Sequence, residues 1–376
     1  MCLRIRSIVK TFALLSVWQA AASFAQTGNY PGLKLDTGKQ IYETACIACH
    51  GPRGKGMPES TVGFEKPDSF PDFSRCDQTT PELNTDWKAV IVHGGRFRGF
   101  SQIMPSFGEA LTNDQINKVV DYLRGFCTNK SWPRGELNLP RALITDKAFP
   151  ENEAVVTTTL NAGGAPGVST AAVYEQRFGV KNEVEVTVPL TFQNEDHTWY
   201  GGFGDSTVGI KRELFSSLRT GSIFSVDGEV TLPAGNKANG LGTGVTTFGT
   251  FAAYGQLLPA NFFLQLQGGA ELPTHTETAP RSLFWNSVVG KSFAPNKGLG
   301  RLWSPMVEFL ANRDFATGAS TDWDVLPQFQ VTLSRRQHIR ADVGVRIPVT
   351  NTGDRQTQVL FYILWDWADG KLTQGW

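Results

Sequence analysis

The chain has 376 residues, with 35 basic and 35 acidic side chains and a net charge of zero. This length allows two domains, and the balanced charge does not favour nucleic acid as a partner. After residue 25, no stretch approaches the roughly 18 apolar residues that a membrane-spanning helix requires.

The first 25 residues have the pattern of a secretory signal peptide. Arg4, Arg6 and Lys10 precede an apolar run at 12–18, and Ser23-Phe24-Ala25, with small first and third residues, suits cleavage. Cleavage lowers the net charge to −3, because three basic residues leave and no acidic residue does. The remaining chain is therefore expected in an oxidising, exported compartment.

The stretch CIACH at 46–50 has the C-x-x-C-H spacing of a c-type haem attachment site. Cys46 and Cys49 are expected to form thioethers to one covalent haem c, and His50 to bind the iron. The alternatives are a redox dithiol or half of a zinc site. A zinc site would need a second Cys/His pair at short spacing, and none follows in the sequence.

The second axial ligand must come from a small set of side chains. Besides the initiator, the methionines are Met57, Met104 and Met306. Met57 lies so close to His50 that the chain would have to double back around the ring edge, whereas Met104 is far enough along to reach the opposite face. We therefore predict His50 and Met104 as metal ligands, with His93 or an open sixth position as alternatives. Met/His ligation suits electron transfer rather than oxygen binding.

Two short helices are predicted on either side of these ligands. Thr37 with Gln40, and Thr112 with Gln115, have the spacing of a capping box. Apolar residues then recur at helical spacing after Thr112. They are Ile116, Val119, Val120 and Leu123.

Residues 33–132 resemble the class I cytochromes c. The resemblance rests on CIACHGPRGKGMP, on the methionine loop MPSFG and on the closing stretch LTNDQINKVVDYLRGF. It implies a small all-α domain with one covalent haem, with His50 and Met104 as iron ligands, and electron transfer without substrate chemistry. Cys76 and Cys127 are not part of the general pattern. In an exported protein they are predicted to form a disulfide, and two separate buried thiols are the alternative.

Residues 133–151, rich in proline and charge, are predicted to be a linker. Beyond them the apolar period becomes two, as in EVEVTVPLTF at 183–192 and HIRADVGVRIPV at 338–349. Strands with one apolar and one charged face form a half-buried sheet. Two architectures fit, a soluble β-sandwich and an outer-membrane barrel.

The connections favour an antiparallel barrel over residues 152–376. Long polar segments alternate with shorter ones, as outer loops and periplasmic turns do in such barrels. The long segments are 193–206, 234–244, 274–282, 311–324 and 350–357. About twelve strands are expected, which places both barrel ends on the periplasmic side. The predicted fold class is thus multidomain, an all-α cytochrome c fold followed by an all-β antiparallel barrel.

The barrel prediction also assigns the two faces of one late strand. Val343 and Val345 should face lipid, while Arg340, Asp342 and Arg346 should line the lumen. Aromatic residues near the C-terminus suit a membrane interface.

The stretches GFGDSTVGIKREL, EVTLPAG and PQFQVTLSRRQHIRADVGVRIPV resemble outer-membrane transporters associated with aromatic-compound degradation. That resemblance implies no particular substrate. The whole chain is similar in architecture to the cytochrome–porin fusions of iron-oxidising bacteria. A domain of roughly 100 residues has a radius of gyration near 13 Å, too large for a twelve-stranded barrel about 24 Å across. The cytochrome domain is therefore expected in the periplasm, beneath or beside the barrel mouth.

Together these features predict a c-type cytochrome that transfers single electrons and is anchored at the bacterial outer membrane by its barrel. The alternative is a pore for small solutes with a periplasmic redox accessory domain. Expected partners are periplasmic redox proteins, outer-membrane lipid and a small-molecule or metal-ion electron donor. No enzymatic activity is expected, because a peroxidase would need an open iron position or a second haem.

Overall fold

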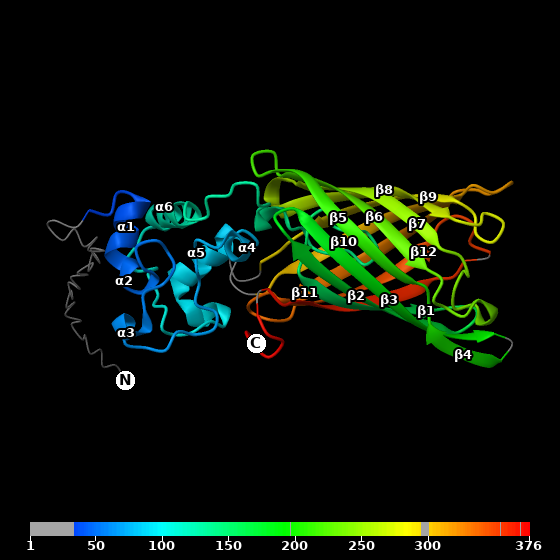
Figure 1. Ribbon diagram of the computed structural model, residues 1–376, viewed down its shortest axis with the longest axis horizontal. Helices are drawn as coiled ribbons and strands as arrows, with labels where there is room; N and C mark the ends of the chain where they lie inside the picture. The colour runs from blue at the N-terminus through cyan, green and yellow to red at the C-terminus, as the bar shows by residue number, and fades with distance from the viewer. Residues whose placement is uncertain (1–33, 196, 295–300, 354, 369) are drawn as a thin grey trace, which may run out of the picture.

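The computed structural model describes residues 34–376 except 196, 295–300, 354 and 369. A helical domain lies at one end of a long β-barrel (Figure 1). The predicted signal peptide, residues 1–25, lies outside the described residues. Among the residues that are described, no helix is both long and apolar enough to cross a membrane.

The N-terminal domain is built from short helices, and both predicted capping boxes are present. Thr37 caps the first long helix and Thr112 the last, each paired with the glutamine three residues later. The elements are α1 (Gly38–Ala45), α2 (Ile47–His50), α3 (Glu59–Val62), α4 (Cys76–Thr79), α5 (Asn84–His93), η1 (Gly95–Arg98) and α6 (Asn113–Arg124).

Helices α1 and α6 cross closely and form the core of this domain. Gly38 makes the crossing possible, because a Cβ atom at this position would collide with the carbonyl group of Lys118. Tyr42 is fully buried at the crossing and donates a hydrogen bond to the carbonyl oxygen of Gly51 (2.6 Å). The apolar face predicted for α6 is buried, at Ile116, Val119, Val120 and Leu123.

The C-terminal domain is a closed antiparallel barrel, which excludes the sandwich alternative. Neighbouring strands pair in sequence order, and β1 also pairs with the last strand, β13. The strands are β1 (Glu153–Asn161), β2 (Gly167–Phe178), β3 (Asn182–Glu195), β4 (Thr198–Phe203), β5 (Ser206–Ser217), β6 (Ser222–Leu232), β7 (Thr247–Leu257), β8 (Phe262–Pro273), β9 (Ser282–Lys291), β10 (Trp303–Asp314), β11 (Asp322–Thr332), β12 (Ile339–Pro348) and β13 (Gln358–Asp366).

Twelve strand positions close the barrel, as predicted. The first half of β3 pairs with β5 and its second half with β4. Only Gly204 and Asp205 separate β4 from β5, so these two strands together occupy one position in the wall. One loop prediction was wrong at this point. Segment 193–206, expected to be a long loop, largely forms the β3–β4 hairpin, because its residues continue the pairing of β3.

The two faces of the wall alternate as predicted for β12. Val343 points outward and is 52 % exposed, whereas Asp342 points inward and is 3 % exposed. The inward-facing Arg346 forms an ion pair with Asp324 of β11 (2.7 Å). Large apolar side chains are exposed on the outside of many strands, for example Ile363 and Val156.

Residues 135–151, which we call the plug segment, run inside the barrel. Residues 133–151 were predicted to be a linker, but most of this stretch is buried rather than exposed. Its hydrogen-bond and ion-pair partners belong to β1, β2, β3, β8, β10, β11 and β13. Strands from opposite sides of a closed sheet can reach one segment only from the lumen.

Buried charges hold the plug segment to the inner wall. The Arg141 guanidinium lies 2.9 Å from a Glu153 oxygen and 2.8 Å from a Glu175 oxygen. On the other side of the lumen, Glu308 of β10 accepts hydrogen bonds from the backbone N–H groups of Leu143 and Thr145 (2.9 Å each). The plug segment is therefore fixed at several points along its length.

Candidate haem site

The CIACH stretch begins at Cys46, the C-cap of α1, and continues as the single turn of α2. The backbone N–H of His50 donates to the carbonyl oxygen of Cys46 (2.9 Å). Residues three and four apart lie on the same face of a helical turn, so Cys46, Cys49 and His50 point the same way. Both cysteines are half-buried free thiols, as attachment to a haem requires.

These three residues line a cavity of about 380 Å³ in the helical domain. Cavities of roughly 300–1,000 Å³ with mostly apolar walls are typical of small-molecule and cofactor sites. The imidazole of His50 packs against Phe70 (5.2 Å between ring centres) and Phe73 (5.1 Å). Other apolar lining residues are Tyr42, Phe64, Trp87, Val90, Ile91, Ile103, Phe107 and Leu123.

The electrostatics of His50 suit a metal ligand. Burial lowers the pKa of His50 to about 4, so its imidazole is neutral at physiological pH and keeps a lone pair for a metal ion. Its buried Nδ1 atom has no hydrogen-bond partner among the described residues. Buried polar atoms normally have a partner, so the cavity fits a bound group that interacts with this ring.

Met104 lines the same cavity as His50. The loop that carries it is fixed by the N–H of Gly95, which donates to the Met104 carbonyl oxygen (3.0 Å). The competing candidates lie elsewhere. Met57 is not among the lining residues, and His93 is exposed and stacks on Phe97 (4.8 Å between ring centres). Iron ligation by Met104 stays a prediction, but the structure places Met104 in the same cavity as His50, as this ligation requires.

An ion pair in the cavity wall was not predicted. Arg98 of η1 and Asp86 of α5 both line the cavity, and their side chains are 2.6 Å apart. Burial raises the pKa of the Asp86 carboxyl, and Arg98 opposes this effect. The available sequence signal was the position of Asp86 on the same face of α5 as Ala89, because a charge on an apolar helical face calls for a buried partner.

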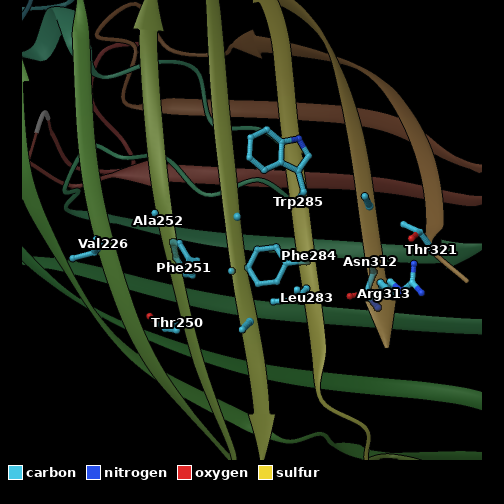
Figure 2. A pocket seen from close by; sticks show the side chains of 14 residues that line it. Val226, Thr250, Phe251, Ala252, Leu283, Phe284, Trp285, Asn312, Arg313 and Thr321 are labelled. Atoms are coloured by element: carbon cyan, nitrogen blue, oxygen red, sulfur yellow. The ribbon is translucent and has the colours of Figure 1, made fainter. Parts of the chain in front are cut away.

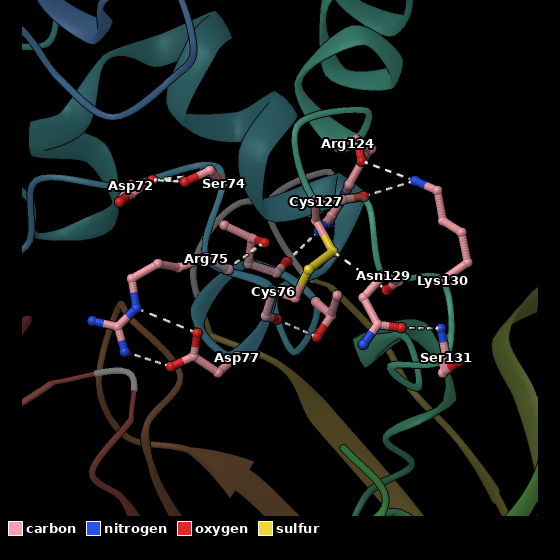
Figure 3. Close-up of a disulfide and its surroundings, with 12 residues drawn as sticks. Asp72, Ser74, Arg75, Cys76, Asp77, Arg124, Cys127, Asn129, Lys130 and Ser131 are labelled. Atoms are coloured by element: carbon pink, nitrogen blue, oxygen red, sulfur yellow. Dashed lines mark hydrogen bonds and ion pairs between the residues drawn. A yellow bond between two sulfur atoms is a disulfide. The ribbon is translucent and has the colours of Figure 1, made fainter. Parts of the chain in front are cut away.

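The predicted disulfide between Cys76 and Cys127 is confirmed (Figure 3). It joins α4 to the chain that leaves α6, with Cα atoms 5.1 Å apart and a sequence separation of 51. Closing a loop of this length stabilises a fold by about 4 kcal/mol in the chain-entropy model. The disulfide thus links two elements that both contribute residues to the lining of this cavity, Thr79 of α4 and Leu123 of α6.

A second hollow, of about 640 Å³, lies in the barrel wall (Figure 2). It is bounded mainly by β6 to β10, and Phe251, Phe284 and Trp285 contribute aromatic side chains to it. None of its described lining residues is a cysteine, histidine or methionine. It therefore offers neither an attachment point nor a usual axial ligand for a haem.

The residues present fit a covalent haem. Cys46 and Cys49 would attach it, and His50 and Met104 would bind its iron, which supplies one-electron redox chemistry. The apolar lining residues, such as Phe64, Trp87 and Phe107, would surround the haem and give the iron a mostly apolar environment.

Comparison with known proteins gives a family match and several structural matches. Residues 34–123 match the family model "Cytochrome C oxidase, cbb3-type, subunit III". No curated protein matches the chain. Among solved structures, the COG4313 outer membrane channel from Pseudomonas putida F1 is similar at 12 % identity and a TM-score of 0.38, covering 58 % of this chain and 97 % of that one.

Two porins give matches of the same kind. The NanC porin has 8 % identity and a TM-score of 0.39, covering 56 % of this chain and 97 % of its own. The KdgM porin has 6 % identity and a TM-score of 0.37, covering 57 % and 98 %. The family match thus covers the helical domain, and the three structures are similar to this chain at low sequence identity.

Proposed function

We propose that this protein is a c-type cytochrome that transfers single electrons through one covalent haem and is anchored at the outer membrane by its barrel. The observation that carries the proposal is the convergence of Cys46, Cys49, His50 and Met104 on one apolar cavity. These are the side chains that attachment and His/Met ligation require. With both axial positions of the iron filled, the domain transfers electrons and performs no substrate chemistry.

The outer surface of the barrel supports a place in a membrane. Large apolar side chains project from the outer face of successive strands, whereas the inner face is polar and charged. A soluble protein rarely exposes so much contiguous apolar area, but a transmembrane barrel requires it. The predicted signal peptide supports export.

The position of the helical domain supports a periplasmic orientation. Arg336, in the short turn 333–338, contacts Gly99 of the helical domain, and Arg177, near the turn 179–181, lies over Trp132. Short turns and both chain ends of outer-membrane barrels lie on the periplasmic side. The haem domain therefore exchanges electrons with periplasmic redox proteins.

The plug segment favours a barrel that acts as a membrane anchor over a barrel that acts as an open pore. Its ion pairs with Glu153 and Glu175 and its hydrogen bonds to Glu308 hold it between two parts of the wall. Breaking a buried ion pair costs about 3–5 kcal/mol. Passage of a solute would require these contacts to open, so the solute-pore alternative is the weaker proposal.

Haem staining after denaturing electrophoresis tests the proposal. The wild-type protein should retain haem, because thioether bonds survive denaturation. The double variant Cys46→Ala/Cys49→Ala should lose the stain completely at an equal amount of protein. A Cys76→Ser/Cys127→Ser variant is the matched control, since it removes two cysteines that do not line the cavity. Full staining of the Cys46/Cys49 variant would refute covalent attachment.

A further inference from the structure

Arg98 is a buried cation at the wall of the haem cavity. Its side chain is 2 % exposed. Nη1 donates to Asp86 Oδ1 (2.6 Å), and Nη2 lies 3.5 Å from the carbonyl oxygen of Arg336 in the barrel. The Nε atom of Arg98 is buried and has no hydrogen-bond partner among the described residues.

The cavity wall near Arg98 is built partly by the barrel. Arg336 donates two hydrogen bonds to the carbonyl oxygen of Gly99 (3.2 and 2.9 Å), and its guanidinium lies 4.5 Å from the ring centre of Phe100, which lines the cavity. Ala368, from the segment after β13, also lines the cavity. Barrel residues therefore help to fix the position of Arg98.

The charge of the lining explains what Arg98 can bind. Among the described residues that line the cavity, Arg98 is the only lysine or arginine, and several others are acidic. A buried N–H group without an acceptor is costly, and Asp86 uses only part of the guanidinium. The cavity therefore has one place where an anionic group is favoured. The guanidinium group of arginine is well suited to a carboxylate, because its N–H donors lie in one plane and can bind both carboxylate oxygens.

A haem carries two propionate carboxylates, the anionic part of an otherwise apolar group. We propose that Arg98 binds a haem propionate, with Asp86 and the Arg336 carbonyl holding the guanidinium in place. This inference rests on the proposed haem function. It makes the barrel turn 333–338 part of the haem site, and it couples the docking of the two domains to the potential of the iron.

Three variants of the full-length, haem-loaded protein test this assignment. Arg98→Gln removes the charge, Arg98→Lys keeps the charge but removes the planar donors, and Arg96→Gln is the control. Arg96 lies on the same short helix but is exposed and does not line the cavity. The readouts are the reduction potential and the propionate bending modes in the resonance Raman spectrum.

Arg98→Gln should shift the reduction equilibrium at least tenfold toward ferric haem, which is 59 mV for one electron, because a cation near the iron favours the ferrous state. Arg98→Lys should change this equilibrium less than threefold but shift the propionate modes. Arg96→Gln should change neither readout. If Arg98→Gln is recovered without haem, the Raman shift of Arg98→Lys decides the assignment.

Unchanged propionate modes in Arg98→Lys, or an unchanged potential in a haem-loaded Arg98→Gln, would overturn the role of Arg98. Arg336→Ala tests whether the barrel contributes to the haem site. It should shift the propionate bending modes, because Arg98 would be held less firmly. Unchanged modes in that variant would remove the barrel from the haem site. Absence of haem from the wild-type protein would instead refute the proposed function, so the two failures are distinguishable.

Discussion

Met104 and His50 reach the same cavity from distant parts of the chain, His50 from the end of α2 and Met104 from the loop after η1. Met104→Ala should lower the reduction potential by roughly 0.1 V or more, a modest part of the ~0.8 V range that axial ligands control. The weak methionine-to-iron absorption band should disappear as well. Potentiometry and absorption spectroscopy on the purified protein measure both effects.

Met57→Ala is the matched control for this prediction, because Met57 does not line the cavity. It should leave the potential and the band unchanged. Loss of the band in Met57→Ala, with its survival in Met104→Ala, would show that the distal ligand had been assigned to the wrong methionine.

The sequence could predict that Cys46, Cys49 and His50 lie together, because the CIACH motif places them within five positions. It could not predict that Arg98 and Asp86 do, although they are only twelve positions apart. Their contact forms because η1 packs back against α5. Neither the sequence spacing nor the charge pattern of η1 specifies that packing.

Local hydrogen bonds made the first and last helices of the first domain, α1 and α6, predictable. The capping boxes at Thr37 and Thr112 involve residues three positions apart and are present as expected. The sequence did not predict the plug segment, because the contacts of this segment are not local. Its contacts depend on closure of the barrel, as in the hydrogen bond from Tyr362 to the carbonyl oxygen of Arg141, which spans 221 positions. A proline-rich segment without periodicity otherwise has the features of a linker.

Because the plug segment lies inside the barrel, we predict a closed lumen. One substitution in this segment should open the lumen. Arg141→Ala leaves Glu153 and Glu175 without this buried partner, a change that costs about 3–5 kcal/mol. Single-channel conductance in planar bilayers should be low for the wild type and higher for the variant. Arg219→Ala, at an exposed position of the β5–β6 turn, should behave like the wild type. A large, steady conductance of the wild-type protein would mean that the plug segment does not close the lumen.

For the molecule as a whole, placement in the membrane depends on the outer face of the barrel. Val343→Arg places a charge on that face and should destabilise the inserted protein by roughly 2–4 kcal/mol if the site is near the bilayer midplane. The variant should lose the faster gel migration that folded barrels show when unheated. Thr352→Arg, in the exposed β12–β13 connection, is the control. Equal heat-dependent migration of both variants would argue against lipid contact at Val343.

The alternation of polar and apolar residues was enough to predict a barrel, its approximate strand number and the faces of β12. It could not predict how the two domains meet. The contacts of Arg336 with Gly99 and of Lys371 with Asp68 (3.1 Å) join residues more than 230 positions apart. Such contacts arise only after both domains have folded.

The most direct test of an outer-membrane cytochrome is a reduced-minus-oxidised absorption spectrum of washed outer membranes that contain this protein. These membranes should show the sharp α-band of a low-spin c-type haem. The band should be absent from membranes that contain equal amounts of the Cys46→Ala/Cys49→Ala variant. A spectrum without the band in wild-type outer membranes, or with the band only in the soluble fraction, would contradict an outer-membrane cytochrome.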